Sequence, residues 1–69
     1  MERLMNFEGK MVSLSYDGHL PDGIIPPVML EGQLTNIDRF ECTFKRKDTG
    51  EILYLLTLDI MIESIKVIE

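Results

Sequence analysis

The sequence predicts a mainly β protein, in which a short N-terminal helix precedes five strongly curved antiparallel strands that close as a small barrel. Apolar and polar residues alternate over short runs along most of the chain, a period typical of strands with one buried face. Segments containing glycine, proline, asparagine or aspartate separate these runs. The length of 69 residues allows one domain, which we place at residues 1–69.

Composition narrows the class of protein further. The chain is 45% hydrophobic and 28% charged, which is ordinary for a globular domain and disfavours disorder. Domains this small usually need a disulfide, a metal or self-association for stability. One cysteine and one histidine can form neither an internal disulfide nor a Cys/His zinc site. We therefore expect no cofactor and a homo-oligomer.

Several locations and functions are disfavoured. The longest apolar stretch, Ile52 to Ile62, is interrupted by Thr57 and Asp59 and falls short of the roughly 20 residues that span a membrane. We expect no membrane association, and the free thiol of Cys42 and a start without a signal-peptide core predict a cytoplasmic protein. No catalytic motif is present, so we expect no enzyme. The net charge of −5 argues against non-specific binding to duplex nucleic acid.

The first part of the chain predicts a helix, a strand and a long loop. Residues 2–8 fit about two helical turns, and residues 12–16 alternate as a half-buried strand. Residues 17–27 contain two glycines and three prolines, which disfavour ladder pairing. We expect Ile24 and Ile25 in this loop to pack against the body of the domain. A loop longer than its connection requires is often functional.

The rest of the chain predicts four more strands. Gly32 marks a bend or a bulge in the first of them. Lys47 to Gly50 is a hairpin turn. The strand Ile52 to Leu58 carries apolar residues on both faces, whereas a small monomeric barrel should show one solvated face. Its outer face is therefore covered either by another copy of the protein or by the N-terminal helix. The four strands are predicted at residues 28–37, 40–45, 52–58 and 62–68.

The candidate binding residues are basic and aromatic. Lys45, Arg46 and Lys47 form the one basic run, and Arg39 lies at the other end of the same predicted strand. These residues either contact RNA phosphates or form a solvated hairpin tip that offsets nearby carboxylates.

Aromatic residues supply the second kind of candidate. Tyr16, Phe40 and Tyr54 can serve as stacking platforms for bases, although the spacing of each fits a core position equally well. Cys42 and Phe44 share a predicted face, which favours a core phenylalanine and an inert buried thiol.

The order of motifs carries a family resemblance. The segment Leu30-Glu31-Gly32-Gln33-Leu34 is followed by Ile37-Asp38-Arg39-Phe40, a strand that ends in Lys45, a glycine turn and two short strands. In this order the chain resembles the Sm-like family, and especially the bacterial RNA chaperone Hfq. The resemblance implies an SH3-like small barrel whose subunits join edge to edge through their last two strands and form rings.

The resemblance also implies a function for particular residues. Sm-like rings bind RNA on their faces and around the pore, and Asp38, Arg39 and Phe40 match the turn that lines one face. Tyr54 matches the tyrosine of a Tyr-Lys-His segment, of which the lysine and histidine are leucines here. Residues 17–27 are an insertion relative to Hfq.

Two functions follow as expectations. The first is a cyclic, ring-forming Sm-like protein that binds single-stranded RNA. The alternative is a non-enzymatic acidic protein-binding or assembly module on the same small barrel, which meets a protein partner through residues 17–27. The acidic balance favours the second function and the resemblance favours the first. The expected RNA contacts are Asp38, Arg39, Phe40, Lys45, Arg46, Lys47 and Tyr54.

Overall fold

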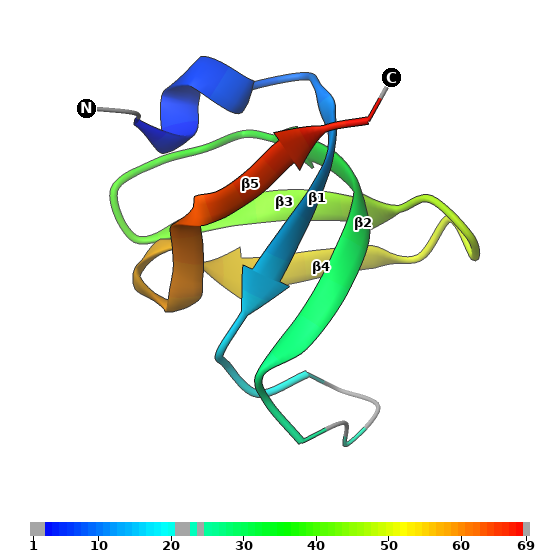
Figure 1. Ribbon diagram of the computed structural model, residues 1–69. Helices are drawn as coiled ribbons and strands as arrows, with labels where there is room; N and C mark the ends of the chain where they lie inside the picture. The colour runs from blue at the N-terminus through cyan, green and yellow to red at the C-terminus, as the bar shows by residue number, and fades with distance from the viewer. Residues whose placement is uncertain (1–2, 21–22, 24, 69) are drawn as a thin grey trace.

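The computed structural model describes residues 3–20, 23 and 25–68 and confirms a mainly β protein. Within these residues five antiparallel strands form one sheet: β1 (Met11–Tyr16), β2 (Val28–Thr35), β3 (Glu41–Arg46), β4 (Ile52–Leu56) and β5 (Ile60–Val67) (Figure 1). Two short 3₁₀ helices accompany them, η1 (Leu4–Phe7) and η2 (Thr57–Asp59). No helix in this described part of the chain is long and apolar enough to cross a membrane.

The N-terminal helix is shorter than the sequence predicts. It is a single 3₁₀ turn of four residues rather than two helical turns over residues 2–8. Gly9 ends it with a φ of 78°, a conformation that glycine adopts without steric cost. The Gly9 N–H donates to the Leu34 carbonyl at 2.6 Å, so pairing with the end of β2 diverts the chain from a longer helix.

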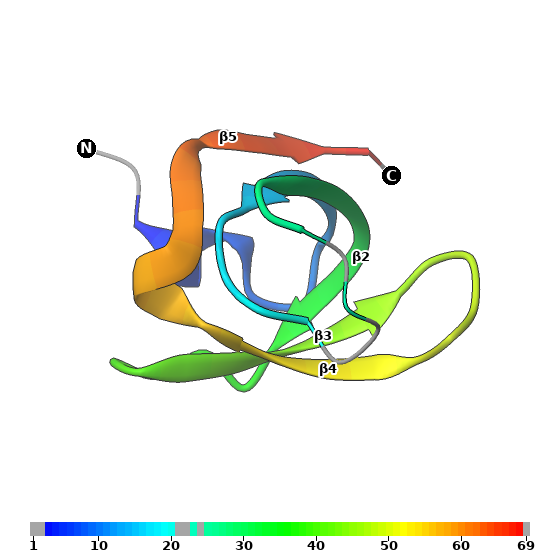
Figure 2. The same cartoon turned by 90° about the horizontal axis from the view of Figure 1, so that it is seen from below.

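The strand order is β4-β3-β2-β1-β5, and β2 connects the two halves of the sheet. Residues 28–33 of β2 pair with β1, whereas residues 32–35 pair with β3. Because β2 curves between these partners, β1 and β5 cross over β3 and β4 (Figures 1 and 2). Within the described residues β4 and β5 have no strand on their outer edges, so the sheet remains open.

Gly32 permits the bend in β2. A Cβ atom at this position would lie 2.7 Å from Phe44 Cε2 and would collide with the Lys45 carbonyl. The register stays regular on both sides of β2, so the glycine marks a bend and not a bulge. A close approach of backbones without a side chain therefore lets one strand serve both halves of the sheet.

The interior is apolar and is formed by the inward residues of all five strands, together with Leu4, Leu20 and Ile37. Tyr16 is one of its largest buried side chains, and its hydroxyl accepts a hydrogen bond from the Leu56 N–H at 3.0 Å. This bond links β1 to β4, which are not neighbours in the sheet. A side chain thus bridges the interior where the backbone ladder does not close.

The strand β5 carries a bulge opposite Ser13 to Ser15. The Ser64 hydroxyl accepts a hydrogen bond from the Ser15 N–H at 2.8 Å and donates one to the Met61 carbonyl at 2.6 Å. The hydroxyl thereby satisfies backbone groups that the irregular register leaves unpaired.

The loop after β1 packs differently from the expectation. Ile25 is 85% exposed, so the prediction that it packs against the domain is wrong, and Ile24 lies outside the described residues. Leu20 joins the core instead. The Asp17 N–H donates to the Asp59 carbonyl at 2.8 Å, which holds the start of the loop beside η2.

Candidate nucleic-acid interface

The turn between β2 and β3 contains three of the predicted RNA contacts. Asp38 Oδ1 accepts hydrogen bonds from the Phe40 N–H at 2.7 Å and the Glu41 N–H at 2.8 Å. The Glu41 and Phe40 amides stabilise the charged carboxylate and hold the pKa of Asp38 below its ordinary value. Asp38 therefore shapes the turn, while Arg39 and Phe40 are left exposed.

Phe40 is 70% exposed and not part of the core. Its spacing from Cys42 fits a core position, but it lies in the turn before β3 and escapes the alternation of that strand. The turn is fixed to η2, because the Thr57 N–H donates to the Phe40 carbonyl at 3.0 Å. The Thr57 hydroxyl also donates to the Arg39 carbonyl at 2.8 Å. A well-held turn thus presents an aromatic ring to solvent.

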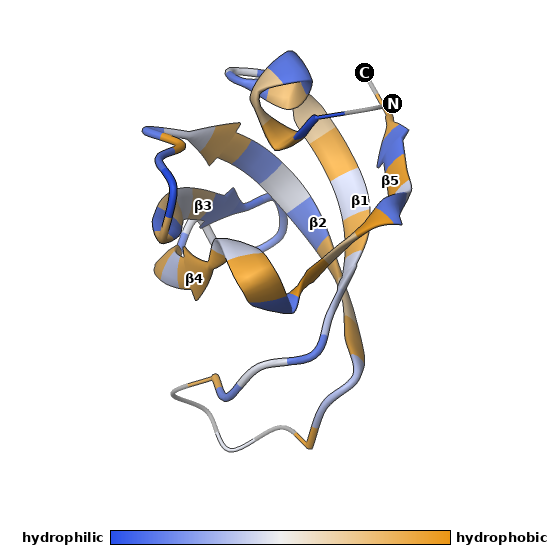
Figure 3. Cartoon of the chain, turned by 90° about the vertical axis from the view of Figure 1, so that its left-hand side faces the viewer, coloured by the Kyte–Doolittle hydropathy of each residue, from blue (hydrophilic) through white to orange (hydrophobic). Residues whose placement is uncertain are grey.

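The outer face of β4 is exposed along its whole length. Ile52 and Leu56 are about half exposed and Tyr54 is 74% exposed, whereas the alternate leucines are buried. Leu58, in η2, is 92% exposed and adds an apolar side chain just after β4. The ribbon is coloured hydrophobic over most of β4, whereas η2 carries both colours (Figure 3). The alternative in which the N-terminal helix covers this face is therefore wrong.

Side chains from three strands surround Tyr54 on this face. Register pairs place Tyr54 opposite Thr43, and Thr43 opposite Thr35. The neighbouring row places Lys45 between Gln33 and Ile52. An aromatic ring, two hydroxyls, an amide and an ammonium group thus share one surface. The sequence analysis does not predict Thr35, Thr43 or Gln33 as site residues. Thr43 could have been predicted, because it lies two residues from Lys45 in the same strand and therefore shares its face.

The basic run does not form one patch. Lys45 and Arg46 are consecutive in β3, so their side chains leave opposite faces of the sheet. Arg46 lies 3.5 Å from the Asp48 carboxylate and 3.6 Å from the Glu51 carboxylate. For Arg46, the structure therefore favours the second interpretation, in which the basic hairpin residues offset the charge of nearby carboxylates.

The remaining candidates lie at different heights along β3. The Phe40 turn precedes the strand and Lys45 is near its far end, a separation of about 17 Å for five extended residues. Tyr54 pairs with Thr43 between them. The structure therefore brings Tyr54 and Lys45 together on neighbouring rows. Arg39 and Phe40 form a second group before the start of β3.

The edge of β4 that faces away from β3 carries backbone N–H and C=O groups that another strand could pair with. Hydrogen bonds from Arg46 N–H to Glu51 O, at 2.8 Å, and from Thr57 N–H to Phe40 O, at 3.0 Å, bracket the pairing with β3. Antiparallel ladders alternate, so between these bonds Ile52, Tyr54 and Leu56 turn their N–H and C=O groups away from β3. The Leu56 N–H is already bonded to the Tyr16 hydroxyl, so another strand would pair at Ile52 and Tyr54.

Within the core, Cys42 is buried as predicted. Burial raises the pKa of its thiol to about 11, and the charges of Asp38, Glu41 and Glu8 add to this effect. The thiol is therefore protonated and unreactive at neutral pH.

The described residues contain no group of three His, Cys, Asp or Glu side chains arranged to hold a metal ion. The chain matches no protein-family model, no curated protein and no solved structure.

Proposed function

We propose that the chain is a ring-forming Sm-like protein with a small-barrel fold that binds single-stranded RNA. The observation that supports this proposal most is the strand order, which leaves β4 and β5 as the two edges of the sheet. These are the last two strands of the chain, the pair through which Sm-like subunits join. Pairing of β4 in one copy with β5 in the next repeats head to tail and can close into a ring.

The chemistry of β4 supports the same assembly. Its edge presents the backbone groups of Ile52 and Tyr54, and its outer side chains are apolar. An apolar edge with free backbone groups is a template for another strand. In a chain of 69 residues, such pairing also supplies the burial that a small core lacks.

RNA contact is proposed through stacking more than through charge. Phe40 and Tyr54 are exposed rings, and stacking on an aromatic side chain contributes roughly 1–3 kcal/mol per base. Arg39 and Lys45 supply the cations near these rings. With so few cations per subunit, we expect a modest dependence of affinity on salt. Repetition around a ring raises the avidity for one strand.

Assembly is tested by light scattering at micromolar concentration. We expect a discrete oligomer for the unchanged chain and a folded monomer for Ile52→Lys, because a charge on an edge strand opposes pairing. Thr43→Lys is the matched control, since Thr43 lies on the same face in a central strand. A cooperatively melting monomer of the unchanged chain would contradict the assembly.

RNA binding is tested by fluorescence anisotropy with short A-rich, U-rich and mixed RNAs at two salt concentrations. Tyr54→Leu keeps the edge apolar and removes the ring, so we expect roughly tenfold weaker binding. Lys45→Gln should weaken binding less, and Lys47→Gln is the control because Lys47 lies in the hairpin turn, outside the surface around Tyr54. Absence of binding at low salt would remove the RNA proposal and leave assembly standing.

A second function is supported by the loop after β1. Ile25 is 85% exposed there, and the chain carries a net charge of −5. An acidic protein-binding module would bind a basic protein through this loop. It becomes the leading function if no RNA binds, and Ile25→Ser is then the first variant to compare in binding to a basic partner.

A further inference from the structure

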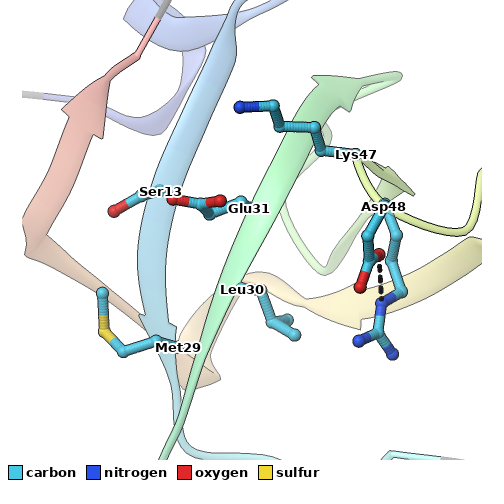
Figure 4. A pocket seen from close by; sticks show the side chains of 7 residues that line it. Ser13, Met29, Leu30, Glu31, Lys47 and Asp48 are labelled. Carbon is cyan, nitrogen blue, oxygen red and sulfur yellow. Dashed lines mark ion pairs between the residues drawn. The ribbon is translucent and has the colours of Figure 1, made fainter.

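A pocket of about 460 Å³ lies away from the Tyr54 surface, between the outer face of β1 and β2 and the tip of the β3–β4 hairpin (Figure 4). This volume is within the range of small-molecule sites. Leu30 and Met29 supply its apolar wall. The polar residues that line it are Ser13, Glu31, Arg46, Lys47 and Asp48.

The backbone holds the two sides of the pocket together. Ser13 in β1 is the register partner of Glu31 in β2. The Lys47 N–H donates to the Glu31 carbonyl at 2.8 Å, which ties the hairpin to β2. Ser13, Glu31 and Lys47 therefore reach the same pocket from three segments that are fixed relative to one another.

Four charged side chains line the pocket: two carboxylates, Glu31 and Asp48, and two cations, Arg46 and Lys47. Arg46 lies 3.5 Å from the Asp48 carboxylate and 3.6 Å from that of Glu51, so its charge is offset by its own hairpin. Glu31 and Lys47 also carry opposite charges and belong to different segments of the pocket wall. Glu31 lies beside Ser13, and the Lys47 side chain extends from the hairpin over β2 toward the same side, with its ammonium farther along the strands (Figure 4). The pocket is thus neutral overall, with one carboxylate and one ammonium held apart.

We propose that this pocket binds a free α-amino acid with an apolar side chain. The ligand ammonium would bind Glu31 and the Ser13 hydroxyl, and its carboxylate would bind Lys47. Its side chain would lie against Met29. A polyanion fits poorly because Glu31 repels it, and a simple cation leaves Lys47 unpaired. This site is independent of the proposed RNA surface.

The test is a titration of the whole chain with L-leucine, followed by two-dimensional amide NMR. We expect saturable shifts at Ser13, Glu31 and Lys47. Two matched probes each carry half of the charge pair: isoamylamine has the ammonium, and 4-methylpentanoate has the carboxylate. Each should bind about tenfold more weakly than leucine, because one charge-assisted contact is lost.

Variants assign the two contacts. Glu31→Gln should weaken leucine binding about tenfold and leave 4-methylpentanoate unaffected or tighter, whereas Lys47→Gln should weaken both leucine and the carboxylate. Lys45→Gln makes the same charge change on the Tyr54 surface and should leave leucine binding unchanged. Melting curves establish that each variant folds. Absence of saturable shifts with leucine, or equal affinity for isoamylamine, would overturn the proposal.

Discussion

The two sides of β4 carry similar apolar residues in opposite surroundings. Leu53 and Leu55 face the interior and are buried against the core. Ile52, Tyr54 and Leu56 face outward and are exposed by half or more. The inner leucines are explained by the fold of one chain, whereas the outer residues are not. Apolar side chains therefore mark two kinds of surface here, one that folding covers and one that association can cover.

The largest expected effect is a difference in stability between variants on the two sides of β4. Leu55→Ala removes a fully buried side chain, and we expect a loss of about 2–5 kcal/mol in the free energy of unfolding. Leu56→Ala removes the same atoms from the half-exposed side, and we expect a loss below about 1 kcal/mol in dilute solution. Urea unfolding at two protein concentrations measures both.

The concentration dependence sharpens this comparison. If copies associate through β4, Leu56→Ala should lower the unfolding midpoint mainly at the higher concentration, because association stabilises the folded state by mass action. Leu55→Ala should lower it at both. Equal losses for the two variants in dilute solution would show that the outer face is covered within the single chain.

A smaller effect is expected at the bridge between β1 and β4. Tyr16→Phe removes the hydroxyl that accepts the Leu56 N–H and leaves that amide without its partner. We expect a loss of about 1–2 kcal/mol in the free energy of unfolding. Tyr54→Phe is the matched control, since it removes a hydroxyl from an exposed ring and should change stability little. Equal effects of the two variants would show that the bridge does not stabilise the open sheet.

Strand alternation predicted much of this arrangement. The buried and exposed sides of β1 follow the period of two in the sequence, and Gly32 marks the bend of β2. In β4 both faces are apolar in sequence, so which side is buried follows only from the structure. The same period already places Lys45 and Arg46 on opposite faces, although adjacent basic residues read as one patch.

Other features depend on contacts between distant segments. The sequence pattern does not state which strands are edges, because that follows from the order in which the whole sheet assembles. Phe40 escapes alternation because Asp38 and Thr57 fix its turn from two sides. Leu20, and not Ile25, packs into the core, which the composition of the loop does not indicate. Tertiary bonds thus decide the residues that local pattern leaves open.

The smallest effect is expected at the turn that presents Phe40. The Glu41 and Phe40 amides lower the pKa of Asp38 in the folded state below its ordinary value of 3.8. Stability from this carboxylate is therefore fully present above that value and is lost as the pH falls through the folded pKa. Asp38→Asn keeps an acceptor oxygen and removes the charge, so the difference in stability between the two proteins should shrink below pH 3.8. Thermal melting from neutral to acid pH measures it, with Asp17→Asn as a control outside the turn. A difference that stays constant across this range would mean that the charge of Asp38 does not hold the turn, and that its shape depends on the bonds from Thr57 instead.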